Sequence, residues 1–103
     1  MPEAYWIAKC TLRDMKAIEP YQEQCKQLVE AHPHVTLARH TRYVELEGSP
    51  HYEHHYLHRF PSFEAALAMY NSPEYQAVAP IRRAACDGCE LVILEAGDLV
   101  NQK

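Results

Sequence analysis

Hydrophobic and polar residues alternate along this chain in a pattern that predicts four strands. The strands are expected at residues 4–10, 35–47, 53–60 and 89–97, where aromatic and β-branched residues recur with a two-residue period. The last of them, "CELVILEAG", is almost continuously apolar, which is typical of a strand buried on both faces. Gly-Ser-Pro at residues 48–50 predicts a loose turn that joins the second and third strands into a hairpin.

Two helical regions lie between these strands. The apolar residues of the first recur at helical spacing, at Ile18, Tyr21, Cys25, Leu28 and Val29. Asp14 can cap a loose first turn, Pro20 is tolerated only near the start of the regular helix, and the helix should end before Pro33. Ser62 can cap the second region, which breaks at Ser72-Pro73 and restarts there as a further short helix.

The order of these elements, βαββαβ, predicts the fold. With right-handed crossovers it packs both helical regions on one face of a four-stranded antiparallel sheet, the ferredoxin-like arrangement of the α+β class. Residues 1–103 are expected to form a single domain. The other face of the sheet is left uncovered, and the few residues outside the elements cannot hide it. We therefore expect a homodimer that packs sheet against sheet, a dimeric α/β barrel.

Composition narrows the possible partners and location. Fourteen acidic and ten basic residues are interspersed and give a net charge of −4, so neither nucleic acid nor an anionic membrane is an expected partner. No leader-like segment opens the chain, and no stretch approaches the roughly eighteen apolar residues of a membrane span, so we expect a cytoplasmic protein. In that reducing compartment, Cys10, Cys25, Cys86 and Cys89 are expected to be free thiols.

Three stretches of the chain resemble one known family. They are "AYWIAK" at residues 4–9, Leu46-Glu47-Gly48 and, above all, "FPSFEAALAMYNSPEYQAVAPIRRAA" at residues 60–85, and they are similar to the family catalogued as domain of unknown function 1330. The resemblance implies a ferredoxin-like subunit and a homodimer of the dimeric α/β-barrel kind. It implies no general reaction, because related barrels include metal-free oxygenases, haem-degrading enzymes, isomerases and plain ligand binders.

Histidines mark the places where this chain departs from that family. Members usually carry paired glycines at the positions of Pro33-His34 and His40-Thr41, and aliphatic residues where this chain has His-Tyr-Leu-His at residues 55–58. Within "HYEHHYLHRF", residues 51–60, groups that titrate near neutral pH therefore replace hydrocarbon. Several such replacements in one hairpin indicate a cavity that takes a ligand.

The period of a strand divides these residues between two faces. Tyr56 and His58 fall on one face with His54 and Phe60, and His55, Leu57 and Arg59 fall on the other. A hairpin that turns at the Gly-Ser-Pro segment pairs residues 40–43 with residues 56–59. That register places His40 close to Arg59, and Thr41 near His58.

These positions supply a candidate site. The candidate catalytic residues are Arg39, His40, Tyr56 and His58, and the candidate substrate-binding residues are His55, Arg59, Tyr70, Asn71 and Tyr75. A histidine can act as general acid or base, and an arginine can hold an anionic group by paired hydrogen bonds. Partial burial beside an arginine should lower the pKa of such a histidine, which suits a base. No glycine-rich phosphate loop exists in a chain with three glycines, so no organic cofactor is expected.

Metal binding is a competing interpretation of the histidines and cysteines, but no metal ligands are assigned. His54 and His58 stand about 13 Å apart along a strand, too far to share one ion. His32 and His34 flank a proline in a predicted surface turn, where solvation is the ordinary explanation. The C-x-x-C motif at residues 86–89 follows a helix and precedes a strand, which disfavours dithiol chemistry. The predicted strand order nevertheless brings Cys10 near Cys89, so three thiols could meet.

Three functions therefore remain open from the sequence. The first is a cofactor-independent enzyme that acts on a small anionic or aromatic metabolite by histidine acid/base chemistry. The second is a homodimer that binds a small ligand without catalysis or is purely structural. The third is a histidine-dependent metal enzyme.

Overall fold

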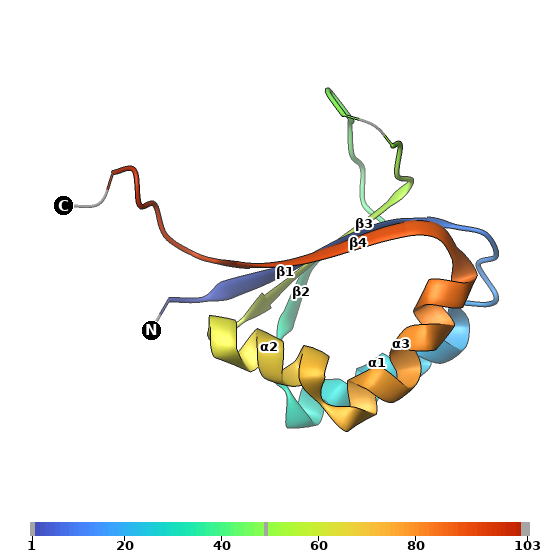
Figure 1. Ribbon diagram of the computed structural model, residues 1–103, viewed down its shortest axis with the longest axis horizontal. Helices are drawn as coiled ribbons and strands as arrows, with labels where there is room; N and C mark the ends of the chain where they lie inside the picture. Colours follow the sequence, from blue (N-terminus) through green and yellow to red (C-terminus); the bar gives the residue numbers. More distant parts are fainter. Residues whose placement is uncertain (1, 49, 102–103) are drawn as a thin grey trace.

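The sheet and its helices follow the predicted order. The computed structural model describes residues 2–48 and 50–101. Its elements are β1 (Ala4–Leu12), α1 (Glu19–Ala31), β2 (Val35–Arg39), β3 (His54–Phe60), α2 (Phe63–Asn71), α3 (Pro73–Ala85) and β4 (Cys86–Glu95). The strands form one antiparallel sheet in the order β2-β3-β1-β4, and all three helices lie on one face of it (Figure 1). The predicted ferredoxin-like α+β fold is confirmed, together with the break in the second helical region.

Local capping explains where the helices begin. The hydroxyl of Ser62 accepts a hydrogen bond from the N–H of Ala65 at 3.0 Å, and the hydroxyl of Ser72 accepts one from the N–H of Tyr75 at 3.1 Å, so both predicted caps are confirmed. Asp14 instead accepts the N–H of Lys16 at 2.9 Å within the loose turn that precedes α1. The regular helix α1 starts at Glu19 without a side-chain cap of its own.

Aromatic side chains between the sheet and the helices form the centre of the core. The Trp6 ring on β1 lies 5.7 Å from the ring of Phe60 and 5.2 Å from the ring of Tyr75, which it meets edge to face. Phe60 and Tyr75 are the largest fully buried side chains. Such rings bury large apolar areas, so this cluster holds α3 against β1 and β3. None of the helices within residues 2–48 and 50–101 has the length and apolar character needed to cross a membrane.

The second strand is much shorter than predicted. It ends at Arg39, and His40 adopts a left-handed backbone conformation with φ of 56°. Residues 41–48 leave the sheet, and Figure 1 shows this segment projecting beyond it. The left-handed conformation ends the strand because a continuing strand requires extended backbone, and it favours the glycine that relatives are expected to carry there.

The predicted hairpin register is therefore wrong. Arg39 lies opposite Tyr56, and Thr36 lies opposite His58, so neither His40 nor Thr41 takes the position predicted for it. The error arises because residues 40–53 form a long projecting connection rather than a tight hairpin turn, and a register is set by the length of the connection. Ser49 of the predicted turn lies outside the described residues.

The face of the sheet away from the helices carries apolar side chains that no helix of the described residues covers. Leu57, Ile7 and Val92 form one row across three strands, as the strand pairing shows. Leu94 and Val35 add to this surface, and Val92 and Leu94 are each 54% exposed. The term open face is used below for this surface. The β4 strand is therefore covered on only one side within one chain, although its sequence predicts burial on both.

Candidate functional site

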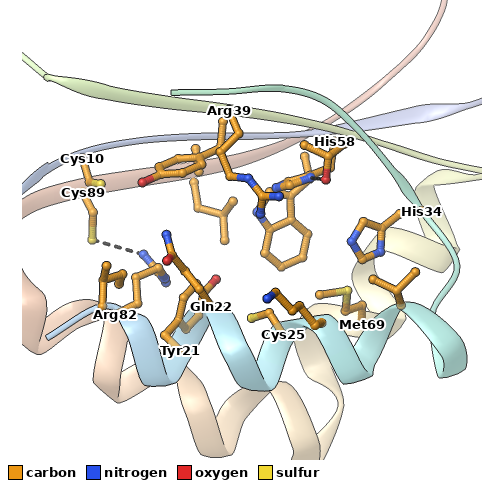
Figure 2. Close-up of a pocket in the computed structure, with 18 of the residues that line it drawn as sticks. Cys10, Tyr21, Gln22, Cys25, His34, Arg39, His58, Met69, Arg82 and Cys89 are labelled. Carbon is orange, nitrogen blue, oxygen red and sulfur yellow. Dashed lines mark hydrogen bonds between the residues drawn. The ribbon is translucent and has the colours of Figure 1, made fainter. Parts of the chain in front are cut away.

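A cavity of about 160 Å³ lies between the helix-covered face of the sheet and α1 (Figure 2). An engineered protein cavity of about 150 Å³ accommodates benzene, so this one can hold a ligand about the size of a single ring. Its apolar wall consists of Trp6, Ala8, Cys10, Ile18, Cys25, Val29, Phe60, Met69, Cys89 and Leu91. Its polar lining consists of Lys9, Tyr21, Gln22, Lys26, His34, Thr36, Arg39, Tyr56, His58 and Arg82.

The sequence of two facing elements leaves this space unfilled. In α1, Leu28 is the buried residue, whereas Tyr21 and Cys25 are only partly buried against the core. Opposite them, β1 presents the short side chain of Ala8 and β3 presents the polar Tyr56 and His58. Protein interiors are normally packed as densely as crystals of small organic molecules, so a small domain rarely contains an unfilled cavity of this volume. A cavity that also has polar groups in its lining is typical of a ligand-binding site.

His58 is held in the cavity as a neutral imidazole. Its Nδ1 lies 2.9 Å from the hydroxyl of Thr36, which leaves Nε2 as the ring nitrogen available to a ligand. Burial above all, and then the neighbouring His34 and Arg39, lowers the pKa of His58 to about 4. A hydroxyl can donate to Nδ1 or accept from it, so Thr36 supports either tautomer of the neutral ring. His58 can therefore offer a ligand either a donor or an acceptor at Nε2.

The low pKa of His58 predicts a loss of stability in acid. The folded state holds this pKa near 4 while an unfolded histidine titrates near 6.5, so between these values the unfolded chain binds the proton more readily. Stability should fall as the pH drops from about 6.5 to about 4, by about 1 to 2 kcal/mol after allowance for partial solvent exposure. Urea unfolding of the wild type and of His58→Val at several pH values measures this.

The comparison isolates one imidazole, because the other six histidines are common to both proteins. The advantage of His58→Val over the wild type should grow as the pH falls. An unchanged difference across the window would show that His58 keeps an ordinary pKa in the folded protein. His32→Gln, at the end of α1 and outside the cavity lining, serves as the control variant and should leave the pH dependence of the wild type in place.

Two guanidinium groups enter the cavity from different elements. Arg39 descends from β2, and Arg82 rises from α3 with its Nη1 donating to Cys89 Sγ at 3.2 Å (Figure 2). Among the described residues, neither arginine has a carboxylate within 4.0 Å, and the Nε of Arg82 is buried without a hydrogen-bond partner. Lys9 and Lys26, by contrast, are paired with Glu90 and Glu23. No aspartate or glutamate lines the cavity within the part of the chain that the structure describes.

Thiols and phenols gather at the end of the cavity near Arg82. Cys10 lies opposite Cys89 on the neighbouring strand, which confirms the predicted proximity of the two residues. Burial, followed by the neighbouring Cys10, raises the pKa of Cys86 to about 12, and burial also raises the pKa of Cys10. The C-x-x-C motif is the beginning of β4 and does not precede it. These thiols are therefore protonated near neutral pH and are poor nucleophiles.

The hydroxyl groups of two tyrosines lie between the sheet and the helices, near the thiols and Arg82. Tyr21 and Tyr75 lie with their hydroxyl oxygens 2.9 Å apart, and burial raises the pKa of both phenols. Both hydroxyls therefore stay protonated, so that one can donate to the other while the Tyr21 hydroxyl borders the cavity.

The predicted site residues fall into two groups. The cavity brings together three of the four candidate catalytic residues, Arg39, Tyr56 and His58. The fourth, His40, lies outside the lining, with its Nδ1 3.2 Å from that of His54. The candidate substrate-binding residues do not line the cavity: His55 and Arg59 lie on the open face, Tyr75 and Tyr70 pack against Trp6, and Asn71 ends α2 in an exposed position.

Several cavity residues were not assigned to the site from the sequence. His34, predicted to be solvated in a surface turn, stacks on Phe60 with a ring separation of 4.7 Å and meets the His58 ring at 5.4 Å, so that prediction is wrong. Arg82 was not singled out in the sequence. Its spacing of seven from the buried Tyr75 was the signal that it faces inward, because residues seven apart share a helix face. Helical spacing also pointed to Gln22 and Lys26, which lie four and eight residues after Ile18, and to Met69, which lies three residues after Ala66.

The described residues include no cluster of side chains that is arranged as a metal site. No group of three or more histidine, cysteine, aspartate and glutamate side chains within residues 2–48 and 50–101 is arranged to hold a metal ion. The three thiols near Arg82 do not form such a group.

The fold and the cavity define a small ferredoxin-like α+β protein with a ligand-sized space under its sheet. The chain belongs to the family described as domain of unknown function DUF1330, whose profile matches residues 3–97. The predicted membership is confirmed. No curated protein matches the chain.

Solved structures with the same fold include proteins of different kinds. One is a protein of unknown function from Rhodopseudomonas palustris, with a TM-score of 0.76 and 18% identity, over 94% of this chain and 84% of that one. Another is a dimeric ferredoxin-like protein of unknown function from Jannaschia sp., with a TM-score of 0.72 and 20% identity, over 91% and 99%. A third is a hydroxynitrile lyase from Passiflora edulis, with a TM-score of 0.67 and 15% identity, over 94% and 95%. At these identities the likeness shows the fold and not the reaction.

Proposed function

We propose that the cavity binds a small anionic metabolite and that His58 exchanges a proton with it, so that the protein is a cofactor-independent acid/base enzyme. The observation that carries this proposal is the charge of the lining. Arg39 and Arg82 reach the cavity without carboxylate partners among the described residues, in a chain whose acidic residues outnumber its basic ones. Arg82 is half-buried, and buried cations are normally paired, so a ligand that brings negative charge completes the site.

The chemistry follows from the effect of such a ligand on His58. In the free protein burial, and after it the nearby positive charge, keeps the imidazole neutral, so it can accept a proton. An anion bound by Arg39 offsets that positive charge and raises the pKa of His58 toward neutrality, where general acid/base catalysis is most effective. Thr36 remains hydrogen-bonded to Nδ1 while Nε2 takes up or gives back the proton. The fold also supports the proposal, because the Passiflora edulis lyase shows that this architecture accommodates an enzyme.

Ligand binding without catalysis is the second candidate function. The pKa of about 4 favours it, because a free imidazole with such a pKa is a weak base at neutral pH. In that case His58 and Arg39 set affinity alone, and binding becomes stronger as the pH falls because the anion stabilises the protonated ring. Proton NMR in D₂O separates the two candidates: an enzyme of this kind should convert the bound acid, or exchange an activated C–H proton beside a carbonyl group for deuterium, and a binder should leave the acid unchanged.

Calorimetry with matched pairs of ligands tests the anion site. Benzoate and butyrate should bind, whereas the neutral benzamide and butyramide should bind at least about tenfold more weakly, because they lack the charge that the arginine recognises. Arg39→Gln should lower carboxylate affinity by about tenfold or more. Arg42→Gln removes the same charge from the exposed connection outside the cavity and should have no effect. Equal binding of acids and amides, or an inert Arg39→Gln, would refute the proposal.

We also propose that two chains pair through their open faces. Charged residues flank the apolar row of Leu57, Ile7 and Val92, with Arg59 in the neighbouring row on one side and Lys9 and Glu90 in the neighbouring row on the other. An apolar centre with a polar rim is the usual composition of a protein interface. The Jannaschia sp. protein, which has the same fold, is described as dimeric, and this supports an assembly of two chains. The cavity lies on the opposite side of the sheet, so the dimer would leave it accessible.

A further inference from the structure

The two arginines of the cavity are held at opposite edges of the sheet. Arg39 stands on β2 and pairs with Tyr56, which pairs with Ala8, which in turn pairs with Leu91 on β4. This row crosses three strand-to-strand steps of about 4.8 Å each, or about 14 Å between the backbones of the edge strands. Arg82 is tied to the far edge through its hydrogen bond to Cys89, two residues from Leu91 on β4.

Both side chains point inward from these edges toward the same space (Figure 2). At the β2 edge, Arg39 is accompanied by the His58 imidazole and the exposed Thr36. Beside Arg82, the buried Cys10 and the Tyr21 hydroxyl border the other end. The cavity therefore has a cationic group at each end and an apolar middle formed by Trp6 and Leu91.

We propose that the ligand is a short-chain dicarboxylate, or an acid of the same size with a second anionic group, which spans the cavity from Arg39 to Arg82. This inference rests on the proposed anion site at Arg39 and His58 and specifies the class of ligand that occupies it. One carboxylate neutralises Arg39 beside His58, and the second neutralises Arg82, which has no carboxylate within 4.0 Å among the described residues. The methylene chain between them lies against the apolar middle.

Charge and volume together restrict the length of the ligand. A monocarboxylate bound at Arg39 leaves the half-buried guanidinium of Arg82 without a carboxylate partner, which is unfavourable. A cavity of about 160 Å³ holds a body about the size of benzene, so a long-chain diacid does not fit. Glutarate and adipate combine two carboxylates with a short chain and are suitable probes, and valerate provides a chain of similar length with one carboxylate.

Isothermal titration of the full chain at neutral pH tests the inference. Glutarate or adipate should bind the wild type about tenfold more tightly than valerate, because the second carboxylate makes a charge-assisted contact with Arg82. In Arg82→Gln this preference should fall to about twofold or less. Arg83→Gln is the matched control, because it removes the same charge from the next residue of α3, which is exposed and outside the cavity. It should keep the full preference.

The alternative results distinguish an error in the dicarboxylate assignment from an error in the role of Arg82 or in the proposed function. Equal affinity of valerate and the diacids for the wild type would overturn the dicarboxylate assignment while leaving the anion site at Arg39 intact. A preference that survives in Arg82→Gln would show that Arg82 does not hold the second carboxylate. Failure of all three acids to bind would overturn the proposed function itself. If thermal melting shows that Arg82→Gln is unfolded, Arg82→Met keeps the apolar stem of the side chain and serves in the same comparison.

Discussion

Replacement of His58 by valine should leave the domain at least as stable as the wild type while weakening carboxylate binding by about tenfold or more. Valine restores hydrocarbon to a half-buried strand position and removes a polar ring that burial penalises. The group left without its partner is the hydroxyl of Thr36, which is exposed and can bond to water. The expected change in the free energy of unfolding is therefore between zero and about 1 kcal/mol in favour of the variant.

Thermal or urea unfolding, paired with titration of the carboxylate that binds the wild type most tightly, measures both effects. His32→Gln should change neither quantity. A loss of about 2 kcal/mol in His58→Val would identify the imidazole as a satisfied structural group, held by Thr36 and by the ring of His34 at 5.4 Å, and would remove it from the site.

Val92→Lys should convert the proposed dimer to a monomer. Val92 lies on the edge strand β4, beside Ile7 in the apolar row of the open face, and a two-fold interface contains two copies of each position, so one substitution introduces two charges. Burying two ammonium groups in an apolar interface without partners costs several kcal/mol, which is comparable to the binding free energy of a modest dimer.

Sedimentation at micromolar concentration provides the measurement. The wild type should sediment at twice the chain mass of 11.9 kDa, and Val92→Lys at the chain mass itself. Val100→Lys makes the same substitution beyond β4, at a position that is 92% exposed, and should remain dimeric. A monomeric wild type would refute the dimer, and a dimeric Val92→Lys would place the interface elsewhere.

The proposed ligand site and the proposed dimer interface lie on opposite faces of one sheet. On β3, His58 and Tyr56 point toward the helices and the cavity, while Leu57 and Arg59 point toward the open face. Because a strand alternates its side chains, a single segment supplies both the ligand site and the proposed interface. This explains why imidazole is found in a strand whose sequence otherwise resembles that of a buried one.

Local patterns in the sequence were sufficient to determine the elements and their faces. Ser62 and Ser72 each precede a helical pattern, and each caps the helix that follows. The caps were predictable because a cap involves residues only three positions apart. Alternation placed Tyr56 and His58 on one face with Phe60 for the same local reason. The strand order then followed from the rules of chain connection, and it placed Cys10 opposite Cys89.

Only the tertiary structure decided the register of β2 and the membership of the cavity. The register depends on how many residues belong to the connection from His40 to Glu53 and not to the strands. The left-handed backbone at His40 shortens β2, and a histidine does not by itself predict that conformation. Arg82 and His34 enter the site because α3 and the end of α1 pack where they do. Such contacts join residues far apart in the chain, so they depend on packing between elements rather than on the pattern within one.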